Sequence, residues 1–210
     1  MKQERLDALA DGIFAIVMTI LVFEIRVPDL GNLATNTSLW ASIKDIYPLF
    51  TSYLLSFAVL FTYWRGNHII ASVYAKNITI QLTNISALFF FFVALVPFSS
   101  NLLGLYNDTQ TAIILFAINT ILIGMSLFWM RQYVDKSHQI KNPELTPAER
   151  RHSYIRVLFP VFSAIVAIIV CFLNKELALT LLTVGVLFNL LPKSTTIISW
   201  LIDPIIGRPQ

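Results

Sequence analysis

The chain contains almost no cysteine. Of its 210 residues only Cys171 is a cysteine, and it lies inside an apolar run. A disulfide framework and a cysteine-pair metal site each need at least two cysteines within the chain, so both are excluded. We expect Cys171 to serve in packing.

Charged residues are also scarce. They make up 13% of the chain, whereas 56% of the residues are hydrophobic and the mean hydropathy is +0.70. A soluble globular domain does not reach these values. The apolar runs are long enough to cross a lipid bilayer as helices. The composition therefore indicates an all-α integral membrane protein.

A catalytic constellation is missing as well. His68, His138 and His152 are not at metal-ligand spacing, and the sequence has neither a glycine-rich phosphate loop nor a serine nucleophile elbow. We therefore expect no enzymatic activity, no catalytic residue, no metal site and no cofactor.

Apolar runs separated by polar stretches and prolines predict six membrane-spanning helices. The first ends at Val27-Pro28, Pro48 begins the second, and Pro97 kinks or ends the third. Together they form one membrane domain over residues 1–192, followed by a short cytoplasmic or interfacial tail at 193–210. The expected spans are 6–27, 47–64, 78–103, 111–130, 154–173 and 177–191.

The basic residues predict the orientation in the membrane. An even number of spans places both termini on one side, together with the long polar connection from Arg131 to Arg156. That side holds twelve of the fifteen Lys and Arg residues, and only Arg26, Lys44 and Lys175 fall on the other. The positive-inside rule then makes both termini cytoplasmic. Because topology already accounts for the net charge of +3, we do not expect nucleic acid as a partner.

The first span carries acidic residues where burying them is costly. At about 100° per residue, one face of this helix is apolar. It comprises Leu9, Gly12, Ile16, Ile20, Phe23 and Val27. Thr19 lies slightly off that line, whereas Asp7 and Asp11 point away from it. The pattern fits equally well a helix packed inside a bundle and a helix that lines a pore.

Asp11 needs a partner if it is buried, because an unpaired carboxylate inside a membrane protein is expensive. Trp64 and His68 are four residues apart, so they share one helical face at the level of Asp11. The indole N–H or the imidazole can donate to the carboxylate. Both an Asp11–Trp64 and an Asp11–His68 contact remain open.

At these residues the sequence resembles the prokaryotic branch of the transmembrane-protein-175 family of potassium channels. The first helix of that family carries the signature R-x-x-x-F-S-D. Here Arg5 and Asp11 stand at the right spacing, but Leu9 and Ala10 replace the Phe and Ser. The resemblance covers nearly the whole chain and continues in Ala15-Ile16, Thr19, Tyr63-Trp64, His68, Asn84, Leu95-Val96-Pro97-Phe98-Ser99 and Leu103-Gly104.

The resemblance implies a homotetramer of six-helix subunits with no conventional selectivity loop, in which the first helices line a central pore. It implies that Ile16 forms the narrow hydrophobic ring and that Ile20 and Phe23 form further rings. Thr19 would supply a hydroxyl ring. The network that positions the pore helix would consist of Arg5, Asp11, Trp64, His68 and Asn84.

The resulting hypothesis is a potassium-permeable cation channel of the plasma membrane, with K⁺ in the pore and a gate at the Ile16 ring. A hydrophobic ring can close by dewetting alone. Two alternatives remain. Asp11 and His68 would carry or sense protons in a proton-permeable or proton-regulated conductor, and a membrane scaffold protein would have no pore at all.

Overall fold

A computed structural model describes residues 3–31, 35–71, 79–137, 140, 147–191 and 194. Within these residues the regular structure is helical, which confirms the all-α prediction. The helices are α1 (Gln3–Ile20) with a 3₁₀ turn η1 (Leu21–Glu24), α2 (Asn36–Asp45), α3 (Tyr47–Ile69), α4 (Ile80–Ala94), α5 (Val96–Leu105), α6 (Gln110–Lys136), α7 (Pro147–Cys171) and α8 (Lys175–Leu190).

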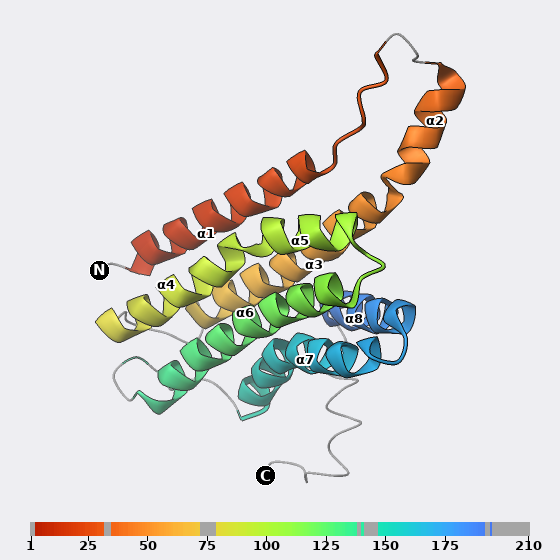
Figure 1. The fold of residues 1–210 in the computed structure, drawn as a ribbon. Helices are drawn as coiled ribbons and strands as arrows, with labels where there is room; N and C mark the ends of the chain where they lie inside the picture. The colour runs from red at the N-terminus through yellow and green to blue at the C-terminus, as the bar shows by residue number, and fades with distance from the viewer. Residues whose placement is uncertain are drawn as a thin grey trace.

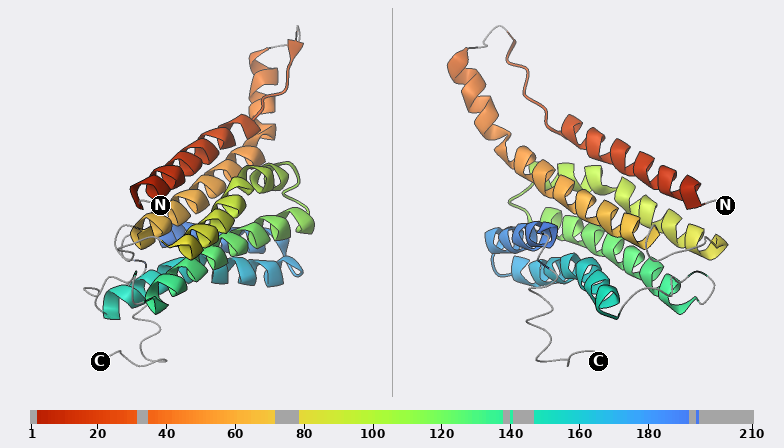
Figure 2. Two further views of the ribbon diagram at one scale, coloured as in Figure 1. Left: turned by 90° about the vertical axis from the view of Figure 1, so that its left-hand side faces the viewer. Right: turned by 180° about the vertical axis from the view of Figure 1, so that it is seen from behind.

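The helices form an elongated bundle with α1 at one edge (Figures 1 and 2). α1 packs against α3 and α4, while α6 contacts α4 and α5 on one side and α7 on the other. α8 packs mainly on α7 and also reaches α3. Because α1 contacts the bundle from one side only, its opposite side is left uncovered within the subunit.

Local sequence explains where the helices begin. Pro48 occupies the first turn of α3, where a proline sacrifices no helical hydrogen bond. The side chains of Thr79, Thr109 and Asn174 accept hydrogen bonds from the first turns of α4, α6 and α8. Such N-caps satisfy backbone donors that have no partner inside the helix.

Pro97 breaks the third predicted span, as expected. α4 ends at Ala94, Leu95 separates the two helices, and α5 begins at Val96 with Pro97 in its first turn. α5 then runs to Leu105, two residues beyond the predicted end. Proline lacks the N–H that would continue the hydrogen-bond ladder of α4, so the chain starts a new helix instead.

Other predicted boundaries shift. The first helix was expected to reach Val27, but α1 ends at Ile20, η1 closes it at Glu24 and Ile25 is extended. Pro28 disfavours helical backbone at Val27 only, so it does not account for an end that lies several residues earlier. The connection predicted between Asp29 and Asp45 contains α2, which a capping box at Thr35 and Ser38 starts.

The second and fourth predicted spans are longer in the structure, and α6 (Gln110–Lys136) continues beyond the expected end at residue 130. The fifth and sixth begin and end earlier than expected. α3 continues through the polar cluster after Trp64 to Ile69, so Trp64 and His68 share one helix. α7 begins at Pro147 and ends at Cys171, and α8 covers Lys175–Leu190. The tail predicted at 193–210 lies outside the described residues except for Ser194.

Four helical stretches of the described chain are long and apolar enough to cross a membrane. The bent pair α2 and α3 raises the number to as many as five. α8 has 16 residues, which at 1.5 Å per residue give a length of about 24 Å, less than the hydrocarbon thickness. A multi-pass membrane protein is thus confirmed, whereas six crossings stay a prediction.

The close contact between α6 and α7 depends on Gly124. A Cβ atom at this position would overlap the Val161 side chain of α7 and lie 2.7 Å from the Tyr63 hydroxyl of α3. That hydroxyl donates a hydrogen bond to the backbone carbonyl of Thr120 at 2.9 Å. Three helices therefore meet where only glycine fits.

We expect Gly124→Ala to destabilise the protein by about 1–3 kcal/mol, the usual cost of overpacking a core. Thermal unfolding in detergent would show it as a lower Tm. Met125→Leu is the matched control, because this neighbouring side chain is exposed and should leave Tm unchanged. An unaltered Tm for Gly124→Ala would contradict the close contact.

Candidate functional site: the free face of α1 and the contacts that orient it

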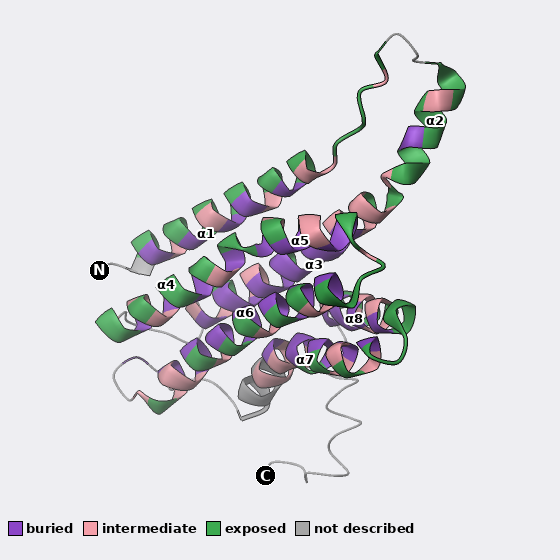
Figure 3. Cartoon of the chain, viewed as in Figure 1, coloured by how far each residue is buried: buried purple, intermediate pink, exposed green. Residues whose placement is uncertain are grey.

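The two sides of α1 differ sharply in burial (Figure 3). The side that packs on α3 and α4 is buried and consists of Leu6, Ala10, Phe14, Val17 and Leu21. Phe14 contacts Phe89 of α4, with ring centroids 5.8 Å apart. This side supplies the apolar packing between α1 and the bundle.

The other side is apolar and uncovered in the single subunit. Ile16 is 59% exposed, Ile20 41% and Phe23 68%. Leu9, Gly12 and Thr19 are exposed with them. We call the surface formed by Leu9, Gly12, Ile16, Thr19, Ile20 and Phe23 the free face of α1. It follows the apolar line predicted from the sequence, except that Val27 of that line lies beyond the end of the helix.

Apolar exposure by itself does not distinguish the free face from a lipid-facing surface, since other helices of the bundle also expose Phe and Leu. Asp11, on another flank of α1, gives a separate indication of what surrounds this helix. It is exposed in the single chain and lies about 10 Å inside the span that begins at Glu4. A carboxylate at that depth is costly against lipid, so protein or water must cover this part of α1.

Asp11 is held by Trp64. The indole N–H of Trp64 donates a hydrogen bond of 2.8 Å to the Asp11 carboxylate. The structure thereby selects Trp64 over His68 as the donor to Asp11. Hydrogen bonds to charged groups are stronger than neutral ones, so the contact links α1 firmly to α3.

His68 supports this contact from the next turn of α3. Its ring stacks on Trp64, with centroids 5.8 Å apart and planes inclined by 18°. Asp7, one turn before Asp11, lies close enough to His68 for their charges to interact. Asp7, Asp11, Trp64 and His68 thus form a polar cluster at the N-terminal end of α1.

Two residues predicted for this network lie apart from it. Arg5 and Asn84 are exposed, and within the described part of the chain neither is hydrogen-bonded to Asp11 or Trp64. In the single subunit the positioning network therefore consists of α1 and α3 residues, without the predicted contribution of α4.

Thr19 turns its hydroxyl back to its own helix. The Oγ1 atom donates to the carbonyl oxygens of Ala15 and Ile16, at 2.8 and 2.9 Å. A hydroxyl has one proton and two acceptor lone pairs. With the proton used, Thr19 can present only acceptor capacity to its surroundings, which suits a cation and its water shell.

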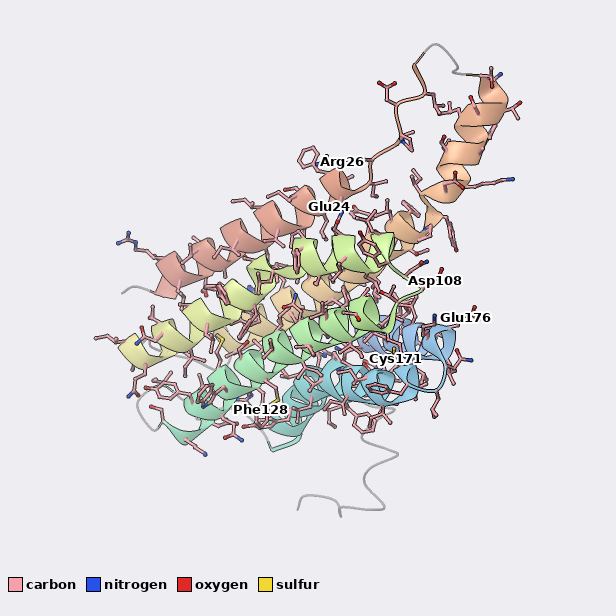
Figure 4. The ribbon with its side chains drawn as sticks, in the orientation of Figure 1. Glu24, Arg26, Asp108, Phe128, Cys171 and Glu176 are labelled. Carbon is pink, nitrogen blue, oxygen red and sulfur yellow. The ribbon has the colours of Figure 1, made fainter. Side chains whose placement is uncertain are left out.

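The far end of α1 has a contact that the sequence reasoning missed. Asn101 of α5 donates through its side-chain amide to the Glu24 carboxylate, and Figure 4 labels Glu24 where α1 ends beside α5. The available signal was an amide side chain inside an apolar helix, a position that normally marks a specific partner.

The described residues contain no group of three or more His, Cys, Asp or Glu side chains that would hold a metal ion. The site therefore consists of two features. Polar contacts hold α1 in position, and one apolar face of α1 is not covered by the rest of the described chain. The long apolar helices define the class of the chain as a multi-pass membrane protein.

Comparison with known proteins identifies the family within that class. The family model described as endosomal/lysosomal potassium channel TMEM175 matches residues 5–97. The crystal structure of a lysosomal potassium-selective channel TMEM175 homolog from Chamaesiphon minutus superposes with a TM-score of 0.76 and 23% identity, covering 89% of this chain and 95% of that one. The predicted resemblance is confirmed: residues 5–97 match the model of this ion-channel family, and the fold is that of the solved TMEM175 homolog.

Relatives in sequence carry two kinds of name. A potassium channel of Chryseobacterium sp. is 27% identical over 164 residues, covering 77% of this chain and 80% of the relative. A potassium channel of Chamaesiphon minutus is 33% identical over 102 residues, 49% of either chain. The human endosomal/lysosomal proton channel TMEM175 is 34% identical over 73 residues, 32% of this chain and 14% of that protein.

We expect Trp64→Phe to lower the stability of the folded protein by about 1 kcal/mol, because it removes the donor to Asp11 but keeps an aromatic ring beside His68. Trp129→Phe is the control, since Trp129 is exposed on α6. In a double-mutant cycle with Asp11→Asn, the effects on Tm should be non-additive. Strict additivity would show that the two side chains do not interact in solution.

Proposed function

We propose that the protein is a potassium-permeable cation channel of the plasma membrane in which four copies of α1 surround a central pore. The uncovered apolar face of α1 carries the proposal. Its burial within the subunit is one-sided, and Asp11, which points away from the free face, also requires cover from protein or water rather than lipid. In an assembly of four subunits the free faces surround the pore, and protein or water covers the remaining flank of α1.

In such a tetramer Ile16 forms the constriction, and Ile20 and Phe23 form rings beyond it. These rings offer no oxygen ligands, so an ion passes with its water or does not pass. Closure then requires only that the ring dewets. Potassium is favoured because it gives up part of its water shell at the narrow ring more easily than sodium does, which predicts modest selectivity.

Names of the relatives support the choice of ion. The bacterial relatives are potassium channels by name, and the similarity to one of them covers 77% of the present chain. The two termini are cytoplasmic in this proposal, because twelve of the fifteen basic residues then lie on the cytoplasmic side.

Replacing Ile16 tests the constriction. We expect Ile16→Asn to raise potassium flux into liposomes, because a polar ring stays wetted. Ile16→Val should change flux little, and Ala15→Asn is the positional control, since Ala15 lies about 100° round the helix from Ile16. Potassium and sodium gradients are measured separately.

An unchanged flux in Ile16→Asn would remove Ile16 from the constriction. Absence of flux from the correctly assembled wild-type protein in every gradient would favour the scaffold function instead. Cross-linking of a cysteine placed at Phe23 reports the number of subunits independently of conduction.

A proton-permeable or proton-regulated conductor is the second candidate function. The cluster of Asp7, Asp11, Trp64 and His68 favours it, since an imidazole can take up a proton in the physiological range and the Asp7 carboxylate lies close enough to His68 for their charges to interact. The mammalian relatives are proton channels by name. A permanently closed hydrogen-bond cluster that only orients α1 would be insensitive to pH.

We expect His68→Ala to flatten the pH dependence of flux between about pH 5 and 8 if protonation of His68 controls conduction. Flux is measured at matched potassium gradients over that range, with His68→Gln as a variant that keeps hydrogen bonding but cannot titrate. A folded His68→Ala protein with the pH profile of the wild type would eliminate His68 as the sensor.

A further inference from the structure

Arg65 of α3 reaches across to the end of α8. Its two terminal nitrogens donate to the carbonyl oxygens of Asn189 at 2.8 Å and Leu190 at 3.3 Å. These carbonyls belong to the last turn of α8, where the helix carries partial negative charge. Arg65 thus caps α8, and this role uses only part of its five N–H donors.

Arg156 of α7 lies beside the same helix end. Asn189 donates through its side-chain amide to the Arg156 backbone carbonyl at 3.1 Å, so Asn189 links α7 to the helix that Arg65 caps. Asn189 is fully buried. The two guanidinium groups are close enough for their like charges to repel.

Some polar atoms at the junction of Arg65, Arg156 and Asn189 make no hydrogen bond to any described residue. The Nε atoms of Arg65 and Arg156 and the Oδ1 atom of Asn189 are buried and have no hydrogen-bond partner in the described part of the chain. Among the same residues, neither arginine forms an ion pair with a carboxylate. Buried polar groups are normally satisfied, and buried charges are normally paired.

The junction lies where a membrane changes from polar to apolar. The apolar stretch of α7 begins at Tyr154, two residues before Arg156, and Arg65 directly follows the apolar part of α3. Both residues are at the end of the bundle that the positive-inside rule places in the cytoplasm. This is the depth of phospholipid head groups.

We propose that Arg65, Arg156 and Asn189 form a binding site for a phosphate group, supplied by an anionic phospholipid or by free phosphate. Phosphate oxygens accept hydrogen bonds from two guanidinium groups and neutralise their repulsion. Asn189 accepts from a hydroxyl, either of the head group or of the phosphate itself. Basic pockets between membrane helices on the cytoplasmic side bind such groups.

Binding to the solubilised full-length protein tests the site. Native mass spectrometry counts phosphatidylglycerol retained by the wild type, with phosphatidylcholine as the zwitterionic comparison. We expect Arg156→Gln to weaken phosphatidylglycerol binding about tenfold, the effect of losing one charge-assisted hydrogen bond. The Arg156 side chain makes no hydrogen bond within the described residues, and Asn189 binds its backbone, so the variant should fold.

Arg26→Gln is the matched control. It removes the same charge at the opposite end of the bundle and should leave binding unchanged. Arg156→Lys keeps the charge but loses the planar fork, so its affinity should fall between those of the wild type and Arg156→Gln. The measurement is of binding rather than current and does not depend on conduction.

Competition with inorganic phosphate distinguishes a lipid head group from free phosphate as the source of the bound phosphate group. Displacement of phosphatidylglycerol by millimolar inorganic phosphate would assign the site to the free ion, and retention would assign it to the lipid; either supports a phosphate site. Equal binding of phosphatidylcholine and phosphatidylglycerol, or equal binding by wild type and Arg156→Gln, would overturn the proposal.

Discussion

The hydrogen bond between Asp11 and Trp64 fixes the orientation of α1, and with it the residues that form the free face. α1 is attached to the bundle along one side only, so its rotation about its own axis decides which residues point away from the subunit. A carboxylate bonded to an indole N–H at 2.8 Å allows one rotation, and that rotation turns Ile16 outward. The membrane strengthens the constraint, because breaking the bond leaves a charge without water.

The opposite end of α1 is anchored in the same manner. Glu24 accepts from Asn101, and thirteen residues of helix, about 20 Å, separate Glu24 from Asp11. Between the two anchors the inner side of α1 is purely apolar, with Phe14 against Phe89. Polar contacts thus set the direction of the helix, and apolar packing holds it there.

Anchors of this kind suit a channel helix. Because the Asp11 and Glu24 carboxylates are bonded to side chains of α3 and α5, the free face carries apolar side chains and one hydroxyl, Thr19, whose proton is already used. In the proposed tetramer the pore wall then carries no fixed charge at its constriction. Passage would depend on wetting and on the ease with which an ion sheds water.

The sequence alone determined the membrane class, the all-helical character, the break at Pro97 and the apolar line through Ile16, Ile20 and Phe23, because composition and helical period depend only on the order of residues. Only tertiary structure decided that Trp64, and not His68, binds Asp11, since both donors share one face of α3. It also decided the Glu24–Asn101 contact and the junction of Arg65 with Asn189. Those partners are far apart in the chain, and their meeting depends on how the helices cross.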